Sequence, residues 1–421
     1  MGDRPSQYHR NDRTDHDNRT DRTHRTDHDD FTRFDPYDHE VHRDPYPIYA
    51  WLRDEHPVYR NEELDFWALS RHADVAAALR DPARFSSSYG VMIEPSSWGP
   101  AAARHMSFVA MDPPRHTRLR GLVSRGFTPR RVAGLEPRIR EIARRHLDAA
   151  LQRGRPDLMA DVAAKVPMDV ISELAGVPMA DRDRIRELGN RSAARPAGAT
   201  DIPRESAEAF LQMAAYYTDL IAGRRRAPRD DLASALLAVA AEDGELTGDD
   251  IVTFLTLLVG AGNETTRYLL GNAWYWAWRH PDQRAAAYAG NIGGWIEETL
   301  RYDGVAQYVA RRLTEDIELH GVTIRRGARM VLLTSAANRD PRAFPDPDRY
   351  DVGRNASAMI GFSTGPHFCL GAALARLEAR VVLEEFVARV ADYDIDEDAA
   401  VRSHGANTRG FAALPATVKR R

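Results

Sequence analysis

The chain has 421 residues and a formal net charge of −4, from 58 basic and 62 acidic residues. This length fits one large domain or two ordinary ones, and the balanced charge gives no general attraction to nucleic acid or to a membrane surface. No apolar run reaches the ~20 residues that span a bilayer, and the N-terminus lacks the apolar core of a signal peptide. We therefore expect a soluble, cytoplasmic protein, and a monomer.

The first part of the chain differs in composition from the rest. Residues 1–33 consist mainly of Asp, Arg, His and Thr, with very few apolar residues. Such a segment cannot bury enough apolar surface to offset the entropy lost on ordering, so we predict a disordered polar tail. Residues 34–421 are expected to form a single domain, because no repeat or clear linker interrupts them.

The predicted elements of this domain are mostly helical. Alternating apolar residues around Val58 and over Phe66–Leu69 predict a hairpin, and from there to about residue 300 the pattern is helical. Residues 338–354, rich in Asp and Pro, are predicted to form a long loop. Further short strands are predicted at 317–319, 322–324 and 330–333. The expected fold class is mainly α with small β-sheets.

A long helix is predicted between Thr247 and His280. Thr247 and Asp250 have the spacing of a capping box and Pro281 ends the pattern, which gives about 33 residues and roughly 50 Å. Its middle reads Gly-Ala-Gly-Asn-Glu-Thr-Thr over residues 260–266. Each glycine costs a helix about 1 kcal/mol relative to alanine, so the segment indicates a local opening of the backbone.

This segment has two simpler interpretations: a dinucleotide-binding fingerprint, or small residues used only for close helix packing. Thr265 stands where the fingerprint needs its third glycine, and a capped helix rather than a strand precedes it, which excludes the fingerprint. Close packing accounts for Gly260 and Gly262. It does not account for Glu264, a carboxylate deep in an apolar helix.

Cys369 is the only cysteine in the sequence, so it cannot form an intramolecular disulfide. It ends a loop with two glycines and a proline, and Leu374, Leu377 and Val381 mark one face of the helix that follows. A buried structural cysteine is the common role of a lone thiol. At a helix N-terminus, however, amide N–H groups stabilise a thiolate, and this loop lets a flat group approach, which favours an axial haem ligand.

The cysteine segment resembles the haem-binding loop of the cytochrome P-450 family, with the pattern Phe-Gly-x-Gly-x-His-x-Cys-x-Gly. Ser363 replaces the first glycine, so the backbone there must be one that serine can adopt. The resemblance implies the P-450 fold, with haem b between the long helix and the helix after Cys369, whose thiolate binds the iron. The matching residues are Phe362, Gly365, His367, Cys369 and Gly371.

The long helix resembles the family's oxygen-binding motif Ala/Gly-Gly-x-Asp/Glu-Thr-Thr/Ser. By position, the resemblance implies that Glu264 and Thr265 are an acid–alcohol pair that delivers protons, with Ala261 against the haem. Proton delivery of this kind supports O–O cleavage without flooding the pocket with water.

Several basic residues complete the resemblance. His116 and Arg120, four residues apart on one helical face, together with Arg311 and His367, match the family's contacts to the haem propionates. Glu298 and Arg301 match its structural Glu-x-x-Arg pair. The third member of that group is assigned to Arg349, although Arg354 lies close by. Singly these are ordinary surface residues, and the assignment depends on their joint spacing.

The implied function is a monooxygenase that inserts one oxygen atom from O2 into a mostly apolar small molecule, by hydroxylation or epoxidation. No second cofactor fingerprint is present, so a separate ferredoxin or flavodoxin is expected to supply electrons, docking near Arg118 and Arg125. The sequence does not distinguish between steroid, terpenoid, fatty acid, macrolide and cyclic peptide substrates. It also does not distinguish primary metabolism from the synthesis of a natural product. The predicted pocket residues are Val91, Met92, Leu257, Val305, Gln307, Tyr308 and Phe411.

Three alternatives were considered. A peroxide-driven haem-thiolate oxygenase is expected to lack the acid–alcohol pair, so Glu264 and Thr265 argue against it. A haem sensor or binding protein without turnover has no use for a proton relay. A helical protein without haem, in which Cys369 is structural, leaves the set of basic residues unexplained.

Overall fold

The computed structural model describes residues 31–196 and 198–421. The polar tail predicted for residues 1–33 therefore lies almost wholly outside the described residues. Within them, no helix combines the length and the apolar character needed to cross a membrane.

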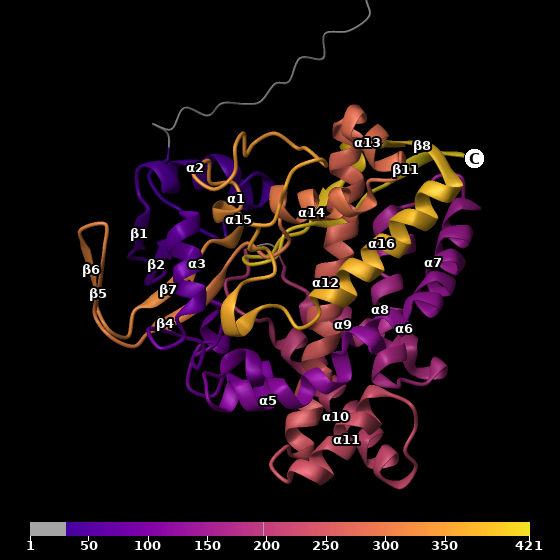
Figure 1. Cartoon of the computed structure of the whole chain (residues 1–421), viewed down its shortest axis with the longest axis horizontal. Helices are drawn as coiled ribbons and strands as arrows, with labels where there is room; N and C mark the ends of the chain where they lie inside the picture. Colours follow the sequence, from indigo (N-terminus) through magenta and orange to yellow (C-terminus); the bar gives the residue numbers. More distant parts are fainter. Residues whose placement is uncertain (1–30, 197) are drawn as a thin grey trace, which may run out of the picture.

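Helices make up most of the described chain, as the sequence predicts (Figure 1). They are α1 (His39–Arg43), α2 (Tyr46–Asp54), α3 (His72–Arg80), α4 (Ala103–Met106), α5 (Arg115–Ser124), α6 (Pro129–Gly134), α7 (Glu136–Leu151), α8 (Val166–Ala175), α9 (Arg182–Ala193), α10 (Arg204–Arg226), α11 (Leu232–Asp243), α12 (Gly248–Arg279), α13 (Pro281–Tyr288), α14 (Ile292–Tyr302), α15 (Thr334–Ala337) and α16 (Ala372–Arg389).

The strands form one five-stranded sheet and three two-stranded ones. In the large sheet the order is β1-β2-β7-β4-β3, with β2 and β7 parallel and the other pairs antiparallel. The small sheets pair β5 with β6, β8 with β11, and β9 with β10. The strands are β1 (Val58–Asn61), β2 (Phe66–Leu69), β3 (Phe85–Ser86), β4 (Val309–Leu313), β5 (Ile317–Leu319), β6 (Val322–Ile324), β7 (Arg329–Leu332), β8 (Val390–Ile395), β9 (Val401–Arg402), β10 (Phe411–Ala413) and β11 (Ala416–Arg420).

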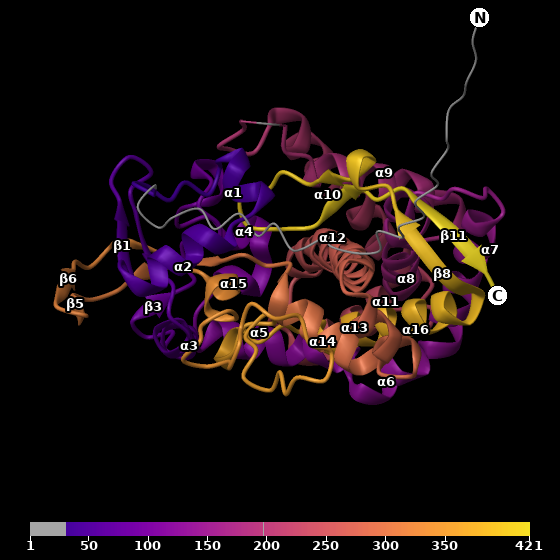
Figure 2. The same cartoon turned by 90° about the horizontal axis from the view of Figure 1, so that it is seen from above.

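Helix α12 is the central element of the fold. Its N-terminus carries the predicted capping box, because the Thr247 side chain accepts from Asp250 N and the Asp250 carboxylate accepts from Thr247 N. Its first half is buried through residues such as Ile251 and Leu255. Figure 2 looks nearly along this helix and shows the other helices and the sheets around it.

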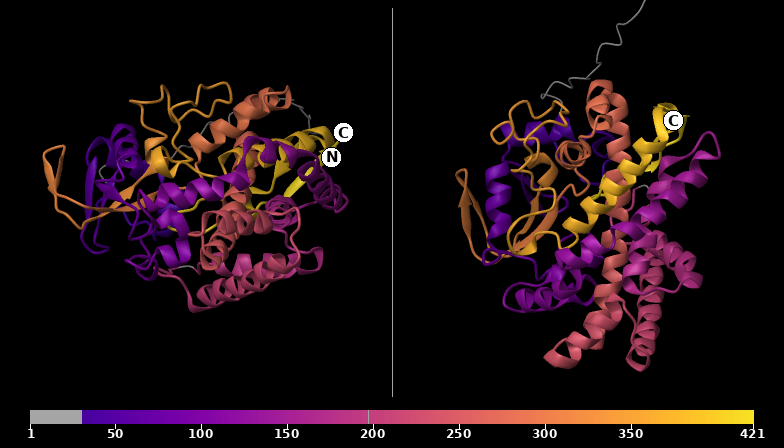
Figure 3. Two further views of the ribbon diagram at one scale, coloured as in Figure 1. Left: turned by 60° about the horizontal axis from the view of Figure 1, so that its bottom comes forward. Right: turned by 45° about the vertical axis from the view of Figure 1, so that its right-hand side comes forward.

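The helix after the cysteine loop, α16, packs against α7, α12 and α14, and Figure 3 shows α16 and α7 side by side. Leu374, Leu377 and Val381 are buried, as their spacing predicts. The rings of Trp274 on α12 and Phe386 on α16 lie 5.3 Å apart within the main core. The cysteine loop is therefore followed directly by a helix anchored in the main core.

Candidate active site

The cysteine loop is a tight turn followed by a short 3₁₀ helix (Gly365–His367). The Cys369 N–H donates to the Phe362 carbonyl at 2.9 Å, which closes the loop. Gly365 has a φ of +69°, and a Cβ there would lie 2.9 Å from the Leu79 carbonyl oxygen, so only glycine fits. Ser363 also adopts a positive φ, +63°, at the position where the family pattern has glycine. Ser363 thus adopts the left-handed backbone conformation that glycine commonly adopts, which the replacement of the first glycine by serine requires.

The Cys369 thiol is exposed on one side and enclosed by protein on the others. Burial raises the pKa of the thiol, whereas the backbone N–H groups of Gly371 and Ala372 and the guanidinium of Arg120 lower it. The net direction is upward, so the helix start alone does not ionise the sulfur. A cation bound to the sulfur removes its proton outright.

On α12, Thr265 and Glu264 have different partners. The Thr265 hydroxyl donates to the Ala261 carbonyl at 2.7 Å, one turn back. The Glu264 carboxylate accepts from the Thr408 hydroxyl at 3.4 Å. The helix is continuous over this stretch, so the predicted local opening is not seen. Gly262 is needed for packing, because a Cβ there would lie 2.7 Å from Ile171 of α8.

Burial raises the pKa of Glu264. The guanidinium groups of Arg267 and Arg195, and hydrogen bonds with Tyr268 and Thr408, act in the opposite direction. The net effect is a raised pKa, because burial outweighs these groups. Sequence reasoning missed Tyr268 and Thr408; the position of Tyr268 four residues after Glu264 was the available signal for one of them.

Two of the four predicted basic residues, His116 and Arg311, are buried, and the other two, Arg120 and His367, are partly exposed. His116 is 1% exposed, and both of its ring nitrogens lack a hydrogen-bond partner within the described chain. Its ring lies 4.1 Å from that of His367, and Arg311 is 3% exposed with one hydrogen bond, to the Ala310 carbonyl. Arg120 donates to the Phe368 carbonyl.

The electrostatics of this group indicate an anionic ligand. Burial lowers the pKa of His116 to about 4, that of His367 to about 3 and that of Arg311 to about 10. None of the four residues forms an ion pair with another described residue. At these values the two imidazoles are neutral and each keeps one N–H donor, whereas Arg311 stays charged. A buried guanidinium and buried N–H groups without acceptors are costly, and two carboxylates such as haem propionates would satisfy them. The donor set therefore fits a haem, whose iron Cys369 would bind.

The Glu298–Arg301 pair is buried and bidentate, with contacts of 2.8 and 2.7 Å. Arg301 also donates to three backbone carbonyls of the predicted loop, those of Asn338, Pro347 and Arg349. The assignment of the Arg349 side chain to this group is wrong. The third guanidinium is that of Arg354, which donates to Glu298 at 3.3 Å, because the loop turns the exposed Arg349 side chain outward.

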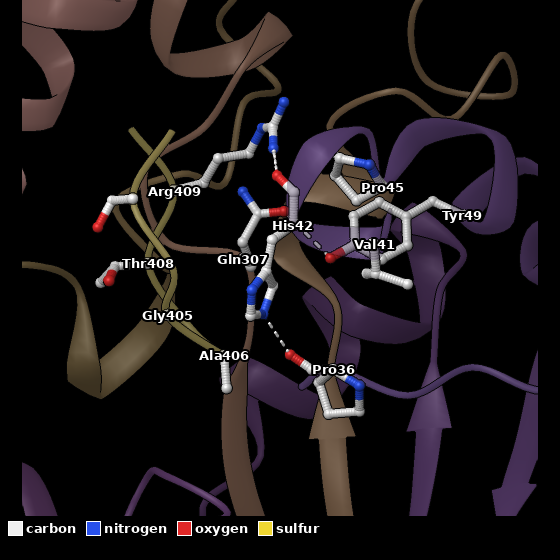
Figure 4. A pocket seen from close by; sticks show the side chains of 11 residues that line it. Pro36, Val41, His42, Pro45, Tyr49, Gln307, Gly405, Ala406, Thr408 and Arg409 are labelled. Carbon is white, nitrogen blue, oxygen red and sulfur yellow. Dashed lines mark hydrogen bonds between the residues drawn. The ribbon is translucent and has the colours of Figure 1, made fainter. Parts of the chain in front are cut away.

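Three of the predicted pocket residues have contacts within the protein. Tyr308 is buried with Phe34 and Tyr49 in a second core cluster, and Phe411 packs on Tyr275 at 4.8 Å. Their role in a substrate pocket stays a prediction. Gln307 bonds to Tyr49 and lines a crevice (Figure 4).

The remaining predicted pocket residues are apolar and come from three segments. Leu257 lies one turn before Ala261 on α12, and Val305 is buried. Val91 and Met92 pack beside the cluster of Ala102, Met106 and Ala110. Their role in a pocket stays a prediction.

Known proteins match both the sequence and the fold. The family model described as "Cytochrome P450" matches residues 294–391. A Mycobacterium tuberculosis protein described as cytochrome P450 123 is 50% identical over 92% of this chain and 97% of its own length. The vitamin D(3) 25-hydroxylase of Pseudonocardia autotrophica is 40% identical over 89% of this chain and 94% of its own.

The fold also matches solved structures over most of the chain. The structure of cytochrome P450 CYP109Q5 from Chondromyces apiculatus superimposes with a TM-score of 0.83 at 36% identity, covering 92% of this chain and 98% of that one. The mainly helical architecture with small sheets, predicted from the sequence, is thereby confirmed. Identity and coverage of this order place the protein, as its cysteine loop indicates, in the cytochrome P450 family of haem-thiolate monooxygenases.

Proposed function

We propose that this P450 inserts one oxygen atom into a mostly apolar small molecule, by hydroxylation or epoxidation, with electrons from a separate ferredoxin or flavodoxin. The observation that supports this most strongly is the joint placement of Cys369, the four basic residues and the acid–alcohol pair. The haem supplies the oxygen-activating chemistry when bound.

Each residue has a distinct role in this proposal. Cys369 would hold the iron, and Gly365 lets its loop turn with a positive φ against the Leu79 carbonyl. Gly371 places no side chain beyond the Cys369 sulfur. His116, Arg120, Arg311 and His367 would bind the propionates, and Ala261 and Phe362 would contact the ring.

Thr265 and Glu264 handle protons. The Thr265 hydroxyl gives up its bond to the Ala261 carbonyl and holds a proton at its Oγ1 for the reacting oxygen. Glu264 accepts and donates protons at its carboxyl group, since burial raises its pKa toward the working range. Both residues lie on one rigid helix, which keeps their spacing fixed.

The substrate is proposed to be apolar because of the side chains near the distal helix. Leu257, Val91 and Met92 offer apolar surface and no charge, which suits a ligand held mainly by desolvation. Two relatives support this class: one is named for hydroxylation of vitamin D(3), and one solved neighbour was crystallised with testosterone.

Isotope labelling tests the proposal. The holoenzyme is first screened with steroids, terpenoids and fatty acids for compounds that shift its Soret band. A hit is then turned over with a surrogate ferredoxin and reductase under ¹⁸O2. The proposal predicts a product that carries one ¹⁸O atom. Oxygenation that needs only added peroxide would support the peroxide-driven alternative instead, and binding without any product would support the sensor.

A further inference from the structure

Glu264 contacts the segment between β9 and β10, residues 403–410, through the hydroxyl of Thr408. Thr408 Oγ1 donates to Glu264 Oε1 across 3.4 Å, and both side chains are half-buried. The contact is long for a hydrogen bond between two oxygens, as proton-transfer contacts often are before a substrate is bound. A threonine hydroxyl has one proton to give and two lone pairs. Thr408 can therefore donate to the carboxylate and accept from a second group at the same time.

The backbone on both sides of Thr408 is bonded to the segment that follows α14. The carbonyl before it accepts from Gln307 N, and the N–H after it, that of Arg409, donates to the Val305 carbonyl, each at 2.8 Å. Together these bonds form an antiparallel β-bridge. The Arg409 carbonyl also accepts from the Asn272 side chain of α12 at 3.3 Å. Thr408 is therefore held at a fixed place beside α12.

Thr408 also lines a crevice between α1 and this segment, and Figure 4 shows Thr408 and His42 on opposite sides of it. The free volume of the crevice is about 10 Å³, close to the space that one water molecule needs. Ser403 and Gly405 belong to the same lining. A Cβ at Gly405 would lie 3.0 Å from Thr408 Oγ1, so glycine leaves space for a water beside this hydroxyl.

Two other kinds of polar group lie near Glu264. Arg195 and Arg267 lower its pKa, but a guanidinium keeps its protons at every working pH. Tyr268 follows Glu264 by one helical turn, and its hydroxyl lies 2.5 Å from that of Ser403. A route through Tyr268 would need Ser403 to reach the crevice. In Thr408, one hydroxyl both bonds to the carboxylate and belongs to a residue of the crevice lining.

We propose that Thr408 carries protons from the crevice to Glu264. A crevice water that has taken up a proton from the solvent passes it to Thr408 Oγ1, while the Thr408 hydroxyl proton passes to Glu264 Oε1. One O–H bond forms and one breaks at the threonine oxygen, so Thr408 ends unchanged and Glu264 gains one proton. Thr408 is a positioning residue, since it acts on the reaction through Glu264. The inference rests on the proposed role of Glu264 and adds its route to solvent.

Infrared spectroscopy of the ferric holoenzyme tests this route without turnover. At a pH where the Glu264 carboxyl is protonated, its C=O band is assigned by its loss in Glu264→Gln, and its shift after mixing with D2O is followed with time. Thr408→Val removes the hydroxyl at nearly constant size and should slow this exchange by roughly tenfold, a modest share of what proton-transfer groups contribute. Thr408→Ser keeps the hydroxyl and should exchange like the parent protein. A hydroxyl that only stabilised the carboxylate would change the frequency of the band but not the exchange rate.

Gly405→Ala tests the crevice end of the route and leaves the Thr408 hydroxyl in place. Its methyl group would stand 3.0 Å from Thr408 Oγ1, in the space of the crevice water, and should also slow the exchange. The matched control is Thr314→Val, which removes a loop hydroxyl that donates to the Ala83 carbonyl at 2.6 Å. This control should leave the exchange rate unchanged.

Exchange at the parental rate in Thr408→Val would overturn the inference. Slowing in Tyr268→Phe alone would also overturn it, because the route would then run through Ser403. Parental exchange in Gly405→Ala would contradict the crevice as the source of the proton. Failure of the proposed function is a separate result: a Glu264→Gln enzyme with an undiminished yield of product per electron pair contradicts the acid–alcohol pair whatever the exchange rates are.

Discussion

At the residue scale, polar groups in the interior carry most of the functional information. A half-buried carboxyl such as Glu264, or a buried histidine such as His116 whose two ring nitrogens have no partner among the described residues, costs free energy in a protein that has no use for it. Such residues could be found from the sequence because their types and spacings are unusual. Their partners could not: Thr408 follows Glu264 by 144 residues, and only the tertiary fold brings them together.

Removal of the Thr265 hydroxyl tests the proton relay at this scale. Thr265→Ala should keep the haem and its Soret band but lower the yield of product per electron pair by roughly a hundredfold, with peroxide formed instead. Peroxide and product are measured together during reductant consumption. Thr218→Ala is the control, because Thr218 makes the same kind of bond to a carbonyl one turn back, at 2.9 Å, on α10. An equal yield of product per electron pair in Thr265→Ala and Thr218→Ala would contradict the role of Thr265 in proton delivery.

At the scale of elements, local signals located the helices better than the strands. The capping box at the start of α12 lies within four residues, and the proline that closes the helix follows directly after its last turn, so the bounds of α12 could be predicted within about a residue from local sequence. The β1–β2 hairpin could be predicted for the same reason. Strands β9 and β10 have only two and three residues, so no alternation pattern marks them; they pair with each other, and β10 also contacts α12.

The correction from Arg349 to Arg354 also belongs to this scale, since it depends on how one loop turns. Arg354→Ala should lower the free energy of unfolding by about 1–3 kcal/mol, because it removes a charged hydrogen-bond donor from the buried Glu298. Arg349→Ala should change it by less than about 0.5 kcal/mol, because Arg349 contributes its backbone carbonyl to Arg301. Urea unfolding followed by haem absorbance compares them, and a larger loss in Arg349→Ala would restore the original assignment.

At the scale of the whole molecule, Asp303 joins segments from both ends of the described chain. Its carboxylate accepts from Arg409 at 2.6 Å, from Tyr46 of α2 at 2.8 Å and from Trp276 of α12 at 2.8 Å. Arg409 in turn donates to the backbone of α1. The nearest sequence separation in this network is 27 residues, which is why pattern reasoning did not reveal it.

This network predicts a dependence of stability on pH. Burial opposes ionisation of Asp303, but Arg409 and Arg402 outweigh it and hold its pKa well below the ordinary value. The folded state therefore gains stability above the unfolded pKa of about 3.9, and loses it as the pH falls toward the folded value. Asp303→Asn should lower the free energy of unfolding by about 3 kcal/mol at pH 7. Below pH 4 the difference in this free energy between the variant and the parent protein should become smaller.

Urea midpoints at pH 7 and pH 3 check this. The exposed Asp183, paired with Arg186 on the surface, provides the control variant Asp183→Asn, which should follow the parent protein at both pH values. If the urea midpoints of Asp303→Asn and the parent protein differ by the same amount at pH 7 and at pH 3, the lowered pKa of Asp303 is contradicted.

The most direct test of the central claim is the carbon-monoxide difference spectrum of the dithionite-reduced protein. Thiolate ligation by Cys369 predicts a strongly red-shifted Soret band, and Cys369→Ser should lose that band. A band typical of histidine-ligated haem, the same spectrum in Cys369→Ser, or no haem signal after reconstitution would contradict the account.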